Sequence, residues 1–106
     1  RLQTAREHAE RVGATRGFAY NTSAMLHNLS RGYAGRGDPA RAIGLYRLAL
    51  EFTLDRDQTI AELTEAYVML GLQLERQRHM DEANSAFRAA LELNPNHQVA
   101  REKLRP

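Results

Sequence analysis

Few residues of this chain combine a reactive type with a spacing that suits chemistry. Glu75 and His79 are four positions apart, so on a helix they would share one face and could ligate a metal together. No third ligand follows at a matching spacing, and His8, His27 and His97 are equally isolated. No nucleophile–base arrangement is visible either. The sequence therefore predicts no enzyme, no metal and no cofactor, and we interpret Glu75 and His79 as surface residues.

Two short motifs resemble functional signatures of other proteins. The tripeptide Arg-Gly-Asp at 36–38 is known from cell adhesion, but Gly37 suits a turn and Asp38 suits the N-cap of a helix that begins with Pro39. The segment "GYAGRG" at 32–37 lacks the glycine spacing and the preceding strand of a dinucleotide-binding fingerprint. We therefore interpret the tripeptide as turn and capping residues and exclude the fingerprint.

Length, charge and composition restrict the remaining functions. The 106 residues suffice for one domain, and a net charge of +2 with scattered basic residues disfavours nucleic acid. No window is apolar enough for a membrane span or a secretory signal. Because the chain begins with Arg1 rather than Met, we expect the native N-terminus to be missing. Without cysteine the compartment stays open, with the cytoplasm favoured.

The sequence predicts an all-α chain, because strand-like alternation never lasts and β-branched residues are sparse. Glycines cluster at 13–17 and 32–37, between helical patterns. Thr59 with Glu62 matches a capping box at a helix start. The six predicted helices cover about 2–12 (with Leu2, Ala5, Ala9 and Val12 on one face), about 18–34, a segment beginning after Asp38, 59–76, 81–93 and 96–104.

The chain is similar to itself at an offset of 41 residues. Apolar, small and aromatic positions coincide without a gap, which is typical of a repeated helical hairpin. The aligned pairs are Leu26 with Tyr67, Leu29 with Leu70, Ser30 with Gly71, Ala42 with Ala83, Tyr46 with Phe87, Arg47 with Arg88, and Ala49-Leu50-Glu51 with Ala90-Leu91-Glu92.

The second copy resembles a tetratricopeptide repeat. The family pattern is Trp-x2-Leu-Gly-x2-Tyr, then Ala-x3-Phe, then Pro. Here Tyr67 stands in the Trp place, Leu74 replaces the Tyr, and the first copy has Leu54 where the proline belongs. The offset exceeds the standard repeat length of about 34 residues, so the chain looks like the longer repeats of kinesin light chains and bacterial regulators. The matching residues are Leu70, Gly71, Ala83, Phe87 and Pro95, with Ala90 at a further small position.

The resemblance implies a right-handed stack of antiparallel helical hairpins, a tetratricopeptide-like α-solenoid. Its small side chains, such as Gly71, Ser30, Ala83 and Ala90, would lie where helices approach closely. Within a single domain of residues 1–106 we expect a helix from a preceding repeat (1–16), a first repeat (18–55), a second repeat (59–95) and a C-terminal capping helix (96–106).

In this family the first helix of each repeat lines a concave groove that holds a peptide or a partner helix. The resemblance therefore implies a protein-interaction module with a protein or peptide partner. One branch of the family clamps a carboxylate in the groove, and Asn28 matches one clamp residue, but Glu65 and Met69 replace the others. The expected groove residues are Ala24, His27, Asn28, Arg31, Glu65, Val68, Met69, Leu72, Glu75 and Arg76.

Other interpretations stay open. Val68, Met69 and Leu72 form an apolar stripe that another part of the same parent chain could cover. The module could also be a regulatory or scaffolding segment of a larger enzyme or transcription regulator, with its groove against another domain. A third alternative is an RNA-binding helical repeat, although no base-reading code is visible in the sequence.

Overall fold

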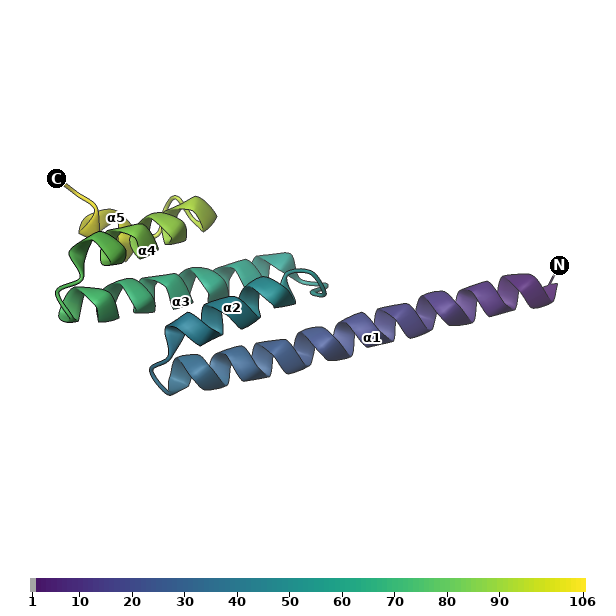
Figure 1. Cartoon of the computed structure of the whole chain (residues 1–106). Helices are drawn as coiled ribbons and strands as arrows, with labels where there is room; N and C mark the ends of the chain where they lie inside the picture. The colour runs from purple at the N-terminus through teal and green to yellow at the C-terminus, as the bar shows by residue number, and fades with distance from the viewer. Residues whose placement is uncertain (1) are drawn as a thin grey trace.

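The fold is built from helices that pack in chain order. The computed structural model describes the backbone of residues 2–106 and the side chains of residues 16–106. In Figure 1, α2 lies between α1 and α3, and α1–α2 and α3–α4 form two antiparallel hairpins. The prediction of an all-α chain is confirmed for this part of the chain. Its five helices are α1 (Leu2–Gly35), α2 (Pro39–Ala49), α3 (Arg56–Arg76), α4 (Met80–Leu93) and α5 (Gln98–Lys103).

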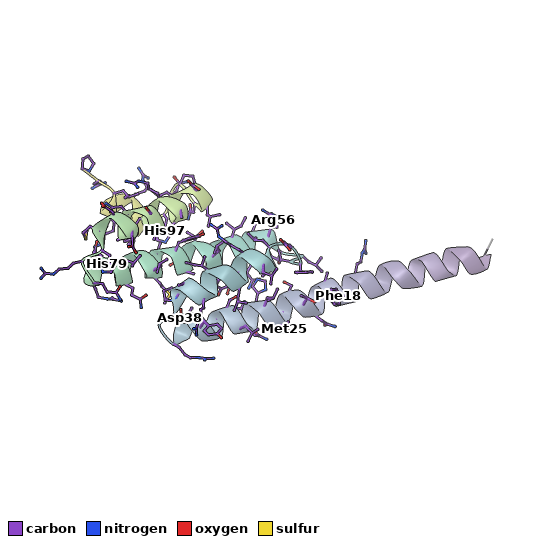
Figure 2. All side chains as sticks on the ribbon, in the orientation of Figure 1. Phe18, Met25, Asp38, Arg56, His79 and His97 are labelled. Atoms are coloured by element: carbon purple, nitrogen blue, oxygen red, sulfur yellow. The ribbon has the colours of Figure 1, made fainter. Side chains whose placement is uncertain are left out.

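The turn before α2 explains the Arg-Gly-Asp tripeptide. Gly37 has a φ of 79°, a left-handed conformation that glycine adopts without a steric penalty. The Asp38 carboxylate accepts a hydrogen bond of 3.2 Å from the backbone N–H of Arg41 and so caps α2. Pro39 occupies the first helical position, where a missing N–H is harmless. Figure 2 labels Asp38 at this turn, and the prediction of turn and capping roles is confirmed.

The start of α3 differs from the prediction. Asp55 is the N-cap, and its carboxylate accepts a hydrogen bond of 3.1 Å from the backbone N–H of Gln58. The predicted capping box of Thr59 and Glu62 is wrong, because Asp is a better N-cap than Thr and lies one turn earlier. Thr59 is instead fully buried inside the helix.

The N-terminal region forms one helix where the sequence predicted two. α1 continues through Gly13 and Gly17 without interruption. Glycine in a helix interior costs only about 1 kcal/mol relative to alanine, and no proline is present here to interrupt the hydrogen-bond ladder. The predicted break was therefore wrong, and the count is five helices instead of six. The apolar face predicted for residues 2–12 falls on side chains outside the described part.

The small side chains lie at close helix contacts, as predicted. Ala83 and Ala90 on α4 are completely buried, and so is Ser30 on α1. At Gly71 the ring of Phe87 occupies the space that a Cβ would need. The backbones of α3 and α4 can approach closely because glycine leaves room for that ring.

The two hairpins bury equivalent positions, with one informative exception. Tyr46 and Phe87, which the 41-residue offset aligns, are both buried. Leu29 of α1, however, is exposed, whereas its counterpart Leu70 packs against the core. The difference follows from the neighbours, because α3 has α2 on one side and α4 on the other, whereas α1 contacts only α2 extensively among the described residues.

Candidate functional site

One face of α3 carries an exposed row of side chains, which we call the α3 stripe: Ala61, Glu65, Met69, Leu72 and Arg76. These residues are three or four positions apart, so they lie along a single side of the helix. The opposite side holds buried residues such as Leu63 and Tyr67. The hydrophobic core therefore leaves the α3 stripe available to other molecules.

A carboxylate–guanidinium pair holds α1 beside α3. Arg31 donates from its Nε to Glu62 Oε1 at 2.6 Å and from a terminal nitrogen to Oε2 at 2.9 Å. The Tyr46 hydroxyl donates to the same carboxylate at 3.1 Å. The Arg31 hydrogen bonds lower the pKa of Glu62 below its ordinary value of 4.5. Burial, followed by the Glu62 charge, raises the pKa of Tyr46 to about 12.

A second link between these helices runs through His27, which is buried. Its Nδ1 lies 2.7 Å from the Ser23 carbonyl oxygen, which can only accept, so we assign the ring proton to Nδ1. The Thr59 hydroxyl lies 2.8 Å from Nε2 and can donate to it. This bond fixes the spacing of α1 and α3 at one end of the α3 stripe.

Hollows of similar size lie on and near the α3 stripe. One of ≈ 280 Å³ lies between α1 and the start of α3, includes Ala24 and Asn28 in its lining, and contains no residue of the α3 stripe. Met69 borders two others, of ≈ 250 and ≈ 240 Å³. A fourth, of ≈ 300 Å³, lies between the N-terminal half of α3 and the end of α4. Two hollows thus border the α3 stripe on its α1–α2 side and one borders it on its α4 side, with space for side chains of another molecule.

On the other side α5 approaches α3. His97, at the start of α5 (labelled in Figure 2), donates from Nε2 to Glu65 at 2.7 Å. Lys103 donates to Glu75 at 2.7 Å. Together with the Arg31–Glu62 pair, these contacts join α3 to side chains of both α1 and the α5 region.

The structure places most of the predicted groove residues on this surface. Ala24, Asn28 and Arg31 are exposed on α1, and all of the α3 stripe except Ala61 had been predicted. Glu75 is partly buried and paired with Lys103. Ala61 was missed, although it precedes Glu65 by four positions and hence shares its face.

Two predicted groove residues were wrongly placed on the surface. His27 and Val68 are both buried, and the 41-residue offset aligns them with each other. Val68 belongs to the core that also contains Ala100 of α5, which covers this side of α3. Arg31, another expected groove residue, is exposed, but its guanidinium is already bound to Glu62.

Glu75 and His79, the two residues whose spacing could suit metal ligation, lie in different surroundings. Glu75 pairs with Lys103. His79 precedes α4 as its N-cap residue and is exposed. Glu75 is partly buried and His79 is exposed, and the salt bridges and hydrogen bonds of residues 16–106 include none between the two side chains.

A family comparison identifies the second hairpin. A family model described as "Tetratricopeptide repeat" matches residues 64–97, which include most of α3 and all of α4. The chain contains a tetratricopeptide repeat. Such repeats are protein–protein interaction modules and are typically non-catalytic. No curated protein and no solved structure matches the chain.

The close packing of α3 and α4 occurs at positions that belong to the tetratricopeptide pattern. Gly71 and Phe87, which match its pattern, lie against each other where α3 and α4 pack. Most of the α3 stripe lies within the matched residues. None of the helices in the described part of the chain combines the length and apolar character needed to cross a membrane.

Proposed function

We propose that the chain binds a peptide or a helix of a protein partner in a groove formed by the α3 stripe and the exposed residues Ala24, Asn28 and Arg31 of α1. The tetratricopeptide match supports a protein partner. The domain division into a preceding helix, two long repeats and a capping helix is part of the same proposal.

The exposure of Met69 is the observation that carries this proposal. Met69 is 37% exposed and Leu72 is half-buried beside it. The charged residues Glu65 and Arg76 lie on either side of this apolar pair along α3. A thioether side chain adapts to irregular partner surfaces. Because Met69 borders two hollows on the α1–α2 side of α3, a partner side chain in either hollow could contact it.

Selection of binding peptides from a display library of natural protein segments tests the proposal. We expect the wild-type chain to enrich a defined set of peptides, and Met69→Asp to lose that enrichment by roughly tenfold or more, as loss of a central contact predicts. Leu72→Ser provides a second, milder change at the same surface. Circular dichroism melts of both variants should stay close to the wild type.

Met25→Asp is the matched control, because Met25 is also exposed but lies on α1 away from α2, as Figure 2 shows. This variant should enrich the same peptides as the wild type. If Met25→Asp removed the enrichment and Met69→Asp preserved it, the interface would lie on the outer side of α1. If Met69→Asp unfolded the chain, the α3 stripe would be an internal contact and the groove would be refuted.

A further inference from the structure

The α3 stripe has a negative end and a positive end. Near its N-terminal end, Glu65 accepts a hydrogen bond from His97. The Nδ1 of His97 lies 3.4 Å from the backbone N–H of Ala100 and caps the start of α5. Asp57 lies in the same ≈ 300 Å³ hollow, and no Arg or Lys within the described residues forms a salt bridge with either acid.

The positive end is Arg76, in the last turn of α3. Its side chain is exposed and borders the ≈ 240 Å³ hollow together with Met69 and Leu72. The salt bridges found among residues 16–106 leave Arg76 without a carboxylate, whereas Glu75 is matched by Lys103. Within the α3 stripe, Glu65 and Arg76 are therefore the two charged residues that form no salt bridge with an Arg, Lys, Asp or Glu of residues 16–106.

The distance between these charges suits a helix as the occupant. Glu65 and Arg76 are eleven positions apart, which corresponds to about 16 Å along the helix axis. Met69 and Leu72 lie between them at intervals of four, three and four positions. A second helix packed nearly parallel or antiparallel to α3 has the same rise per residue and presents side chains at the same intervals.

We propose that the groove binds an amphipathic helix of a protein partner that lies antiparallel to α3. An acidic residue of this helix contacts Arg76, apolar residues four and seven positions later contact Leu72 and Met69, and a basic residue eleven positions later contacts Glu65. This inference rests on the proposed function of the groove. The antiparallel direction is preferred because it puts the partner's acid near its own N-terminus and its base near its C-terminus, which stabilises that helix.

A library of unconstrained random peptides, each long enough for four helical turns, tests the inference on the whole chain. The bait is the wild-type chain or the doubly reversed variant Glu65→Lys/Arg76→Glu. We expect wild-type selections to contain an acid followed eleven positions later by a base, with apolar residues between them. The doubly reversed variant should select the opposite order of charges.

The matched control is the double variant Arg88→Glu/Glu92→Lys, which reverses two exposed charges on α4. It should select the same peptides as the wild type. For one enriched peptide, each single reversal at Glu65 or Arg76 should weaken binding roughly threefold to tenfold in fluorescence anisotropy, less so at high salt.

The outcomes separate this inference from the proposed function. The proposed charge order would be refuted if the enriched peptides depended on Met69 but showed no order of acid and base. It would also be refuted if the doubly reversed variant selected the same order as the wild type. Either result would leave the proposed groove unaffected. An acid and a base about five positions apart would indicate an extended peptide, given a strand rise of about 3.3 Å, and would overturn the helix. Absence of any enriched peptide would contradict both proposals.

Discussion

Gly71 lies against the ring of Phe87 so closely that a Cβ at position 71 would be 2.5 Å from Phe87 Cε1. Two further ring carbons would lie at 2.8 Å. Phe87 is completely buried, so its ring cannot simply turn away into solvent. The contact joins the C-terminal third of α3 to the middle of α4 within the second hairpin.

Gly71→Ala should therefore destabilise the chain despite the higher helix propensity of alanine. We expect a loss of about 1–3 kcal/mol in the free energy of unfolding, as for other overpacked sites. Gly44→Ala is the control, because a Cβ at Gly44 on α2 meets no atom within 4 Å. That variant should gain up to about 1 kcal/mol. Urea denaturation measures both, and equal stabilisation by both would refute the close contact.

The same contact predicts a coupling between positions 71 and 87. Phe87→Leu alone should leave a cavity and destabilise the chain by about 1–3 kcal/mol. Combined with Gly71→Ala, it should cost less than the sum of the two changes, because the smaller side chain admits the new methyl group. A double-mutant cycle gives the coupling energy, and strict additivity would contradict the geometry.

The Arg31–Glu62 pair should make stability depend on pH in the acid range. The folded-state pKa of Glu62 is lowered, so its contribution is present above the unfolded value of about 4.5 and is lost as pH falls through the folded value. Glu62→Gln should cost about 1 kcal/mol at neutral pH, since Arg31 is half-exposed. The cost should shrink as the pH falls below about 4.

Thermal melts over a pH series measure this effect. Glu92→Gln, at an exposed position on α4, is the control and should follow the wild-type profile. A Glu62→Gln profile parallel to that of the wild type through the acid range would show that the pair does not lower the carboxyl pKa.

Tyr46 should produce the opposite dependence at alkaline pH. Its folded-state pKa is about 12, above the ordinary value of about 10. Its contribution is therefore complete below pH 10 and is lost as pH rises toward the folded value. Tyr46→Phe should flatten the decline in stability between these values and remove the last phenol ionisation from an ultraviolet titration. A titration unchanged by Tyr46→Phe would contradict the assignment.

The N-cap of α3 gives a direct test of the corrected helix start. Asp55→Ala should lose about 1 kcal/mol of stability, whereas Asp55→Asn should retain most of it because Asn caps equally well. Guanidinium denaturation measures both variants. If Asp55→Ala melted like the wild type, the helix would be capped elsewhere.

Local patterns predicted those parts of the fold that depend on neighbouring residues. Asp38 and Pro39 identify the start of α2 because capping involves only the next few positions. The small residues Gly71 and Ala83 stood out because the 41-residue offset shows them in register with Ser30 and Ala42. Repetition of a pattern was thus a reliable indicator of close packing.

Contacts between distant elements were the source of the errors. Thr59 looked like a cap because nothing in the sequence near it reveals that its hydroxyl meets His27 of another helix. Val68 looked exposed because helical periodicity alone does not show which sides α5 covers. His27 and Val68 occupy equivalent positions at the 41-residue offset, so the same wrong assumption, that this position is exposed, was made for both residues.

Because α1 is uninterrupted, its length determines how its N-terminal half is rotated about the helix axis relative to the two hairpins. In Figure 1 its N-terminal half projects beyond the two hairpins, and the molecule measures 65 × 26 × 17 Å along its principal axes. Each residue of a helix turns by about 100° and advances by about 1.5 Å. One residue inserted near Gly17 would therefore rotate everything N-terminal to it by more than a quarter turn without altering the α3 stripe. The number of residues in α1 therefore sets the direction in which its far end faces relative to the groove.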